Sequence, residues 1–329
     1  MKGQMRWKLI ALLKTIWHLP GIHEIGLFVY QKWRIFWHCW VTRLDLEKIR
    51  QQVFLLQESG LASPQQRSPR LIVSFTSFPD RISEVFAVAY SLLTQSLKPD
   101  AVILWLAEEE FPHKEKDLPQ ELLYLQSYGL SIQWCENLLS YKKLVPALQR
   151  YPEDIIVTAD DDIYYPPDWL EPLYTAYLAD PTSVQAHAAG VACDDTGGIL
   201  PLSSRKYLLS WFHEAPVPSY RYCQVGGPGV LYPPHCLHKD VCRTDVFLEQ
   251  CSANDDEWFW AMAILGGTKV HCLKQKCGAL RFIDPKRQYL PGVRQSLLSF
   301  NKGVEGDLQR AAIPALYPEM RTILRRSSS

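Results

Sequence analysis

The sequence predicts an α/β protein with an open, mostly parallel sheet that carries helices on both faces. From residue 71 onwards, short apolar β-branched runs alternate with segments of helical periodicity, and this alternation is typical of parallel βαβ units. One of these runs, at residues 154–165, passes directly from an apolar strand into three consecutive carboxylates. A chain of 329 residues with 47% hydrophobic and 12% aromatic residues can also bury a sizeable core.

The elements follow one another in regular order. Residues 71–77 and 101–106 are expected strands, and residues 82–95 form a helix because their apolar side chains recur at helical spacing. The further expected elements are a helix over 118–128, a strand over 130–134, a short helix over 141–150, a strand that opens at Ile155, and helices over 169–178 and 252–265. Right-handed crossovers place the carboxyl ends of parallel strands at one edge. We therefore expect Ser74, Thr76, Leu106 and the three carboxylates to line one crevice.

The three carboxylates are Asp160, Asp161 and Asp162. Adjacent carboxylates repel one another unless a cation neutralises them. In extended chain the outer two face one side, and a pair of hard oxygen ligands suits Mg²⁺ or Mn²⁺ that also holds a phosphate. The alternative is an acidic loop, or a cap for the helix that starts near Pro167.

A second acidic group, Asp255, Asp256 and Glu257, opens the predicted helix over residues 252–265. Capping explains one acid at a helix start, but three exceed what a cap needs. A Gly-rich turn, with glycines at 226, 227 and 229, precedes this helix. Such a turn lets the backbone approach a ligand closely.

The amino-terminal segment differs in charge from the rest. Residues 1–50 hold nine Lys/Arg and three Asp/Glu, a balance of +6, which leaves −6 for the remainder. Residues 5–19 and 28–40 combine Trp with Lys and Arg at amphipathic spacing, which suits a membrane interface. No run reaches the ~20 apolar residues of a spanning helix. We expect residues 1–57 to bind a membrane surface rather than nucleic acid, or to pack on the α/β body or another subunit.

Residues 58–69 are rich in Pro, Ser and Gln and are typical of a linker. The nine cysteines include no Cys-x-x-Cys pair, which favours a reducing compartment with buried thiols. Together with the basic extension, this predicts a cytoplasmic protein, peripheral on the inner membrane face.

Six segments, in order, resemble bacterial glycosyltransferases of the GT-A fold that build capsule or lipopolysaccharide chains. They lie at residues 73–82, 91–106, 140–148, 155–170, 226–234 and 254–263. The resemblance implies a GT-A-like, Rossmann-type catalytic domain over residues 70–310, preceded by the helical extension and followed by a tail over 311–329. It also implies a nucleotide-sugar donor, UDP-sugar first, a Mn²⁺ or Mg²⁺ ion, and a hydroxyl acceptor on a surface glycan or lipid-linked chain.

The resemblance assigns the donor side as follows. The carboxylates match the family's Asp-x-Asp motif, so that Asp162 ligates the metal and Asp160 contacts the metal or the ribose. Asp161 is either a donor-site residue or a structural hydrogen-bond acceptor. The other expected donor contacts are Ser74, Thr76, Arg81 and Lys143, with Lys142 as the alternative lysine.

The resemblance also implies a catalytic base, for which Asp256 is the first choice and Asp255 the second. His271 is the expected further metal ligand, with a structural role as its alternative. An alternative function is sugar-nucleotide nucleotidyl transfer, but that chemistry calls for a Gly-rich basic loop after the first strand, where this chain reads SFTSFPDRI. A non-catalytic sugar-binding or scaffold protein is the remaining alternative.

Overall fold

The computed structural model describes residues 36, 39, 43–64, 67–208, 217–274, 277–289 and 304–326. The chain divides into two compact units, one of residues 1–44 and 284–294, the other of residues 45–283 and 295–329. The second unit holds every candidate site residue. The amphipathic segments predicted over 5–19 and 28–40 lie outside the described residues except for Phe36 and Cys39. No helix in the described ranges has the length and apolar character needed to cross a membrane.

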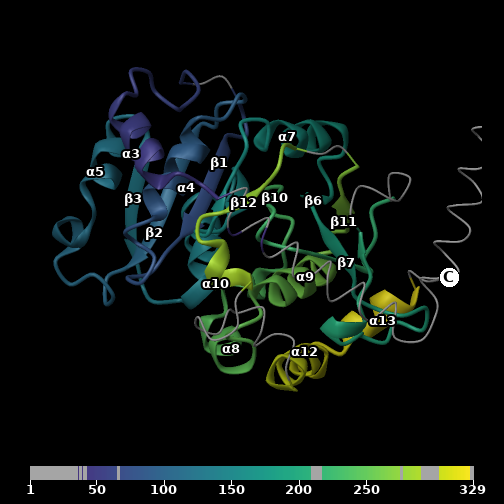
Figure 1. Cartoon of the computed structure of the whole chain (residues 1–329). Coiled ribbons are helices and arrows are strands. Elements are labelled where there is room, and N and C mark those ends of the chain that lie inside the picture. The colour runs from purple at the N-terminus through teal and green to yellow at the C-terminus, as the bar shows by residue number, and fades with distance from the viewer. Residues whose placement is uncertain are drawn as a thin grey trace, which may run out of the picture. The chain divides into compact units, whose positions relative to one another are not determined.

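A seven-stranded sheet forms the centre of the larger unit, in the order β11-β6-β10-β4-β1-β2-β3 (Figure 1). Its strands are β1 (Leu71–Thr76), β2 (Ala101–Ala107), β3 (Leu130–Cys135), β4 (Ile155–Ala159), β6 (Val184–Ala186), β10 (Val230–Tyr232) and β11 (Val270–Cys272). Every neighbouring pair is parallel except the two that involve β10, which runs antiparallel to β4 and β6. The predicted mostly parallel α/β class is confirmed.

Two small sheets accompany the central one. β5 (Ile163–Tyr164) pairs with β12 (Arg281–Phe282), and β7 (Ala189–Val191) lies between β8 (Tyr207–Leu208) and β9 (Tyr222–Gln224).

Helices cover both faces of the central sheet. The helices of the larger unit are α3 (Leu46–Phe54), α4 (Val85–Leu93), α5 (Gln120–Gln126), α6 (Val145–Arg150), α7 (Leu170–Ala179), α8 (Thr244–Gln250), α9 (Asp255–Leu265), α12 (Val304–Leu316) and α13 (Glu319–Arg326). The smaller unit contributes α10 (Pro285–Tyr289). Short 3₁₀ turns occur at η2 (Lys114–Asp117), η3 (Leu139–Lys143), η4 (Leu202–Ser204) and η5 (Lys239–Cys242).

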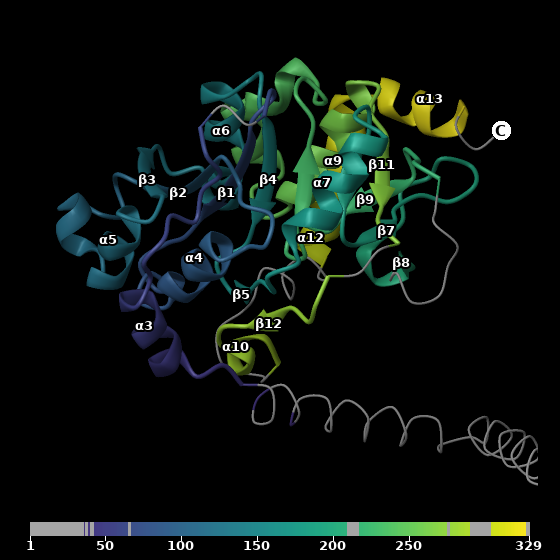
Figure 2. The same cartoon turned by 90° about the horizontal axis from the view of Figure 1, so that it is seen from above.

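The two faces bury different partners. One face of the sheet carries Ile72, Ile103 and Ile156. These side chains share a buried core with Phe259 of α9 and Leu144 beside η3. Helix α7 packs against β6 and β10 from the other side, so that α7 and α9 enclose that half of the sheet (Figures 1 and 2). Helix α9 also packs against β9, and it shares its buried core with Ile156 of β4, the strand that ends at the first acidic cluster.

Two predicted boundaries shift. Residues 45–57, which we assigned to the extension, belong to the larger unit, because Ile49 and Val53 of α3 are buried and Arg50 pairs with Glu121 of α5. The boundary at residue 310 falls inside α12. The predicted tail is packed helix, since Ile313, Met320 and Leu324 are buried.

Candidate active site

The first acidic cluster stands at the carboxyl end of β4, beside the end of β1. Strand β4 ends at Ala159, so Asp160 is the first residue beyond the sheet. Because β10 runs the opposite way, the turn that precedes Val230 reaches the same edge, with Val230 opposite Thr158. The antiparallel strand thus brings the glycines at 226–229 to the acidic cluster.

Lys143 lies between the two acidic clusters. Its Nζ is 2.9 Å from Oδ1 of Asp160 and 3.0 Å from Oδ2 of Asp255. The residue is only 5% exposed. Burial acts to lower the pKa of Lys143, but the carboxylates of Asp160 and Asp255 outweigh it and hold the pKa well above its usual value. A permanently charged ammonium therefore joins two segments that are distant in sequence.

Arg81 pairs with the other two aspartates of the first cluster. Its Nη1 lies 2.5 Å from Oδ1 of Asp161 and 3.1 Å from Oδ2 of Asp162. Asp161 also accepts a hydrogen bond from Ser77 Oγ at 2.7 Å, so both its carboxylate oxygens are occupied. These contacts match the structural-acceptor alternative for Asp161.

Two oxygens of the cluster remain open. Among the described residues, neither Oδ2 of Asp160 nor Oδ1 of Asp162 has a hydrogen-bond or ion-pair partner. Their side chains keep 32% and 24% exposure, so both can be reached by a ligand. Burial, together with Asp160 and Asp161 and against the opposing effect of Arg81, raises the pKa of Asp162 to about 6. The cluster thus carries more negative charge than its cations neutralise.

These features fit a divalent cation. No group of three or more His, Cys, Asp or Glu side chains in the described ranges is placed to hold a metal. Two carboxylates are nevertheless enough for Mg²⁺ or Mn²⁺ when substrate phosphates and water complete the shell. Asp160 and Asp162 are the residues that would supply them.

Asp256, in the first turn of α9, faces the glycine turn. Its Oδ2 accepts a hydrogen bond from the Gly226 backbone N–H at 2.9 Å, whereas its Oδ1 is buried and has no partner among the described residues. Burial and the neighbouring charge of Asp255 raise the pKa of Asp256 to about 7. A carboxylate with such a pKa is well suited to take a proton near neutrality.

Side-chain hydrogen bonds hold the glycine turn in place. Tyr165 Oη accepts from the Asp160 N–H at 2.8 Å and donates to the Gly227 carbonyl at 2.8 Å. Trp169 Nε1 donates to the Pro228 carbonyl at 2.7 Å. At Gly229 a side chain is excluded by a φ of +112° and by the Trp169 ring, 2.5 Å from where a Cβ would stand. The turn is therefore fixed relative to Asp160.

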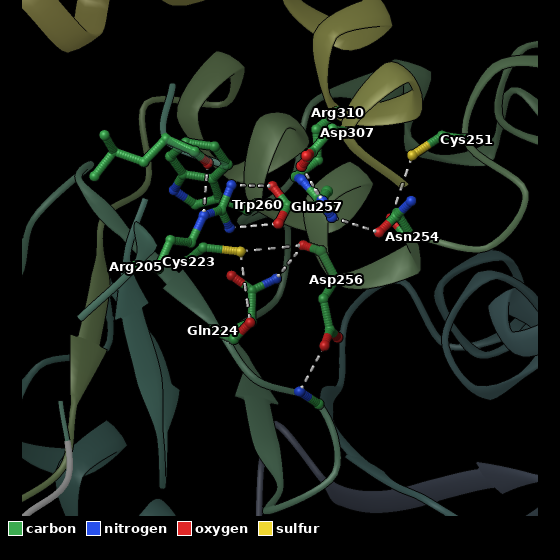
Figure 3. Close-up of polar contacts among 12 residues, drawn as sticks. Arg205, Cys223, Gln224, Cys251, Asn254, Asp256, Glu257, Trp260, Asp307 and Arg310 are labelled. Atoms are coloured by element: carbon green, nitrogen blue, oxygen red, sulfur yellow. Dashed lines mark hydrogen bonds and ion pairs between the residues drawn. The ribbon is translucent and has the colours of Figure 1, made fainter. Parts of the chain in front are cut away.

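Glu257 does not face the site. Arg205 binds both its carboxylate oxygens, with Nη2 3.1 Å from Oε2, and both side chains are buried (Figure 3). Gln224 Nε2 donates to the Asp256 carbonyl at 3.1 Å. These contacts fix the start of α9. Figure 3 shows the Asp256 carboxylate directed away from Glu257, and the Gly226 N–H donates to it.

Three predicted residues lie apart from the cluster. Ser74 is fully buried, donates to the Lys143 carbonyl at 2.6 Å and accepts from Trp105 Nε1 at 2.9 Å. Thr76 donates to the Trp105 carbonyl at 2.8 Å. His271 stands on the edge strand β11, where its Nδ1 is 2.7 Å from Oε1 of Gln185. These contacts match structural roles, and we include none of the three in the site proposed below.

Lys142, the alternative lysine, points elsewhere. Its Nζ lies 2.6 Å from Oε2 of Glu110. Our sequence reasoning missed Ser77, Tyr165 and Arg205. Ser77 immediately follows the first strand, so its position in the sequence could have indicated a place in the site. No sequence feature near Arg205 indicates its contact with Glu257.

Comparisons with known proteins give only distant likenesses. No protein-family model matches the chain, and no curated protein matches it. The structure of S. aureus TarS 1–349 aligns with 65% of this chain and 59% of its own length, at 15% identity and a TM-score of 0.41. The chain thus spans less than two thirds of that structure.

Two further structures are similar at the same level. The mannosyltransferase PcManGT from Pyrobaculum calidifontis, in complex with GDP-Man and Mn²⁺, is 14% identical over 90% of this chain and 86% of its own, with a TM-score of 0.41. The inositol-1-phosphate CTP transferase from T. maritima is 12% identical over 76% and 98%, with a TM-score of 0.38. Because all these TM-scores are below 0.5, we base the function on the site's own geometry.

Proposed function

We propose that the chain is a metal-dependent glycosyltransferase that moves a sugar from a nucleotide-sugar donor to a hydroxyl group. The observation that carries this proposal is that Asp160 and Asp256 meet at one glycine turn, while the buried Lys143 joins Asp160 to Asp255. This arrangement provides a place for a charged diphosphate and, across from it, a carboxylate that can accept a proton. An inverting transfer to a hydroxyl uses both.

On the donor side, Asp160 and Asp162 would hold a Mn²⁺ or Mg²⁺ ion through their open oxygens. The ion, when bound, offsets the charge of the departing diphosphate. Lys143 keeps its proton and stands against Asp160, where its charge favours an anionic ligand. Arg81 holds the second and third aspartates and orients them.

On the acceptor side, Oδ1 of Asp256 is the general base. As the acceptor oxygen attacks the anomeric carbon, its proton passes to Asp256 and the bond from that carbon to the diphosphate breaks. A buried acceptor atom without a hydrogen bond is costly, and an acceptor hydroxyl would supply the missing donor. Attack from the face opposite the diphosphate inverts the anomeric centre. The proposed acceptor is a surface glycan or a lipid-linked chain.

The test is nucleotide release from a panel of nucleotide sugars, with UDP-sugars first, in Mn²⁺ and in EDTA. We expect release in Mn²⁺ only, and loss of metal-dependent nucleotide binding in Asp162→Asn. Asp256→Asn should still bind donor but lose turnover by about 10²–10⁴-fold. Release of pyrophosphate from a sugar phosphate and a nucleoside triphosphate would instead establish a nucleotidyltransferase, and inactivity in both assays would establish a non-catalytic protein.

We also propose that the basic, Trp-rich amino-terminal segment binds the cytoplasmic membrane surface. Its composition supports this. A truncation should begin after residue 44, because Ile49 and Val53 belong to the core of the larger unit. The truncated protein should leave the membrane fraction and stay active on soluble acceptors. An inactive or insoluble truncation would place the segment at a protein interface.

A further inference from the structure

A cavity of about 480 Å³, lined by no residue of the two acidic clusters, lies between the loop at residues 196–201 and helices α12 and α13. Its polar lining is dominated by three arginines, Arg310, Arg321 and Arg325, against the single carboxylate of Asp307. The loop contributes Gly197 and Gly198. None of these residues takes part in the proposed transfer reaction.

The three arginines are not equivalent. Arg310 is buried, pairs with Asp307 and donates from Nη1 to Oδ1 of Asn254 at 3.2 Å. Arg321 and Arg325 are exposed, and among the described residues their side chains form no ion pair or hydrogen bond. The cavity therefore carries two positive charges that the described part of the protein leaves unneutralised.

Helix electrostatics do not account for this pair. A cation in the last turn of a helix, such as Arg325 in α13, interacts favourably with the helix dipole, but Arg321 stands in the first turn, where a cation is unfavourable. The two are four residues apart, a spacing at which like charges destabilise a helix. An anion between them removes both penalties, and arginine binds phosphate and carboxylate through paired N–H groups.

The loop is shaped to lie against α13. Gly197 has a φ of +79°, and a Cβ there would stand 3.0 Å from the Arg325 backbone nitrogen. Ile199, Leu200 and Pro314 add apolar surface to the lining. This combination favours an anionic group carried on a partly apolar ligand over a bare ion.

We propose that this cavity is a second binding site, which takes a phosphate or carboxylate group and is separate from the nucleotide site. Figure 3 shows Arg310 and Asp307 on one side of the start of α9 and the Asp256 carboxylate directed away from them. Asn254, which accepts from Arg310, directly precedes Asp255. The site thus contacts the segment that carries the candidate base without entering the reaction itself. This inference does not depend on the proposed function.

The test uses inorganic phosphate as the probe, with full-length protein in EDTA and chloride at matched ionic strength as the reference. Phosphate affinity is measured by calorimetry for the wild type, the single variants Arg321→Gln and Arg325→Gln, the double variant Arg321→Gln/Arg325→Gln, and Arg326→Gln as control. Arg326 is on the same helix and its replacement removes one positive charge, as each single variant does, but it does not line the cavity. We expect the double variant to bind phosphate at least about tenfold more weakly, and the control to bind as the wild type does.

A second arm identifies the source of the anion. The same proteins are titrated with a short-chain phosphatidylglycerol below its micelle concentration, so that membrane binding by the amino-terminal segment does not enter. Binding of this lipid that is lost in the double variant but not in the control assigns a lipid headgroup, and loss of phosphate binding alone assigns a soluble anion. The proposal is overturned if the wild type does not bind phosphate, or if the double variant and the control bind equally well. Circular dichroism of each variant checks that the fold is intact.

Discussion

Nζ of Lys143 lies 3.0 Å from Oδ2 of Asp255, at the point where η3 meets the first turn of α9. The same nitrogen lies 2.9 Å from Asp160. The donor side and the base side of the proposed site therefore share one cation, and a change at Lys143 affects both.

Replacement of Lys143 by Met tests this shared role. Two carboxylates lose their buried partner, and removal of one member of a buried ion pair costs about 3–5 kcal/mol of stability. We expect a large drop in the urea midpoint together with loss of nucleotide binding in Mn²⁺. Lys142→Met is the control, because Lys142 is equally buried but pairs with Glu110. It should lose stability and keep nucleotide affinity. Equal nucleotide affinity in the two variants would remove Lys143 from the site.

The pH dependence of stability follows from Asp162 and Asp256. Their folded-state pKa values, about 6 and about 7, lie above the usual value of 3.8. At these two groups the folded state therefore binds more protons than the unfolded state between pH 4 and 7, so their contribution to stability falls as pH rises through this range. His187, whose pKa is lowered to about 4 by burial, contributes in the opposite direction. Each unit of pKa difference corresponds to about 1.4 kcal/mol.

We expect the thermal midpoint of the wild type in EDTA, relative to that of Asp256→Asn, to decrease from about pH 4 to about pH 7. Added Mn²⁺ should reduce the pH dependence that Asp162 contributes to the thermal midpoint, because the ion binds the deprotonated carboxylate. A difference between wild type and Asp256→Asn that does not change over this range would contradict the raised pKa of Asp256.

The pH dependence of catalysis has the opposite direction. Asp256 acts as a base only when deprotonated, so kcat/KM should rise with pH and level off above its pKa of about 7. Donor binding, measured separately, should not show this inflection at about 7. An Asp255→Asn variant removes a neighbouring negative charge and should move the inflection to lower pH. An unchanged inflection in Asp255→Asn would assign it to another group.

Gly226 and Gly227 provide a graded test of the turn. A Cβ at Gly226 would stand 2.6 Å from Oδ1 of Asp256 and 2.9 Å from Nζ of Lys143. A Cβ at Gly227 would meet only Asp160 Oδ2 and Ile163, each at 3.3 Å. Gly226→Ala should therefore displace the base and lower kcat strongly, whereas Gly227→Ala should affect mainly metal affinity. Turnover of Gly226→Ala at the wild-type rate would mean that Asp256 is not the base.

The sequence predicted the long strands and the acidic clusters because their signals are local. The apolar runs at β1, β2 and β4 are buried almost completely. Carboxylates that follow a strand can be read directly from the sequence. The strands β6 to β11 have two or three residues each, too few to show a period, and tertiary pairing defines them.

Side-chain direction was harder to predict. Ser74 alternates onto the same face of β1 as Ile72 and is buried beneath Trp105, so the last part of the strand does not open onto the crevice as we expected. The choice between Lys142 and Lys143 depends on η3, whose backbone turns consecutive residues toward Glu110 and toward Asp160. No periodic pattern encodes such a turn.

The reversed direction of β10 has a consequence for how this protein can diversify. Parallel strands deliver the residues that follow them to the reactive edge, whereas β10 delivers the residues that precede it, and these close the long segment between β7 and β10. In the proposed reaction, the acceptor side would thus be bordered by a segment that is separate from the strands supporting the donor side. Changes in that segment would then alter which acceptor is recognised while β1 and β4 preserve the donor half.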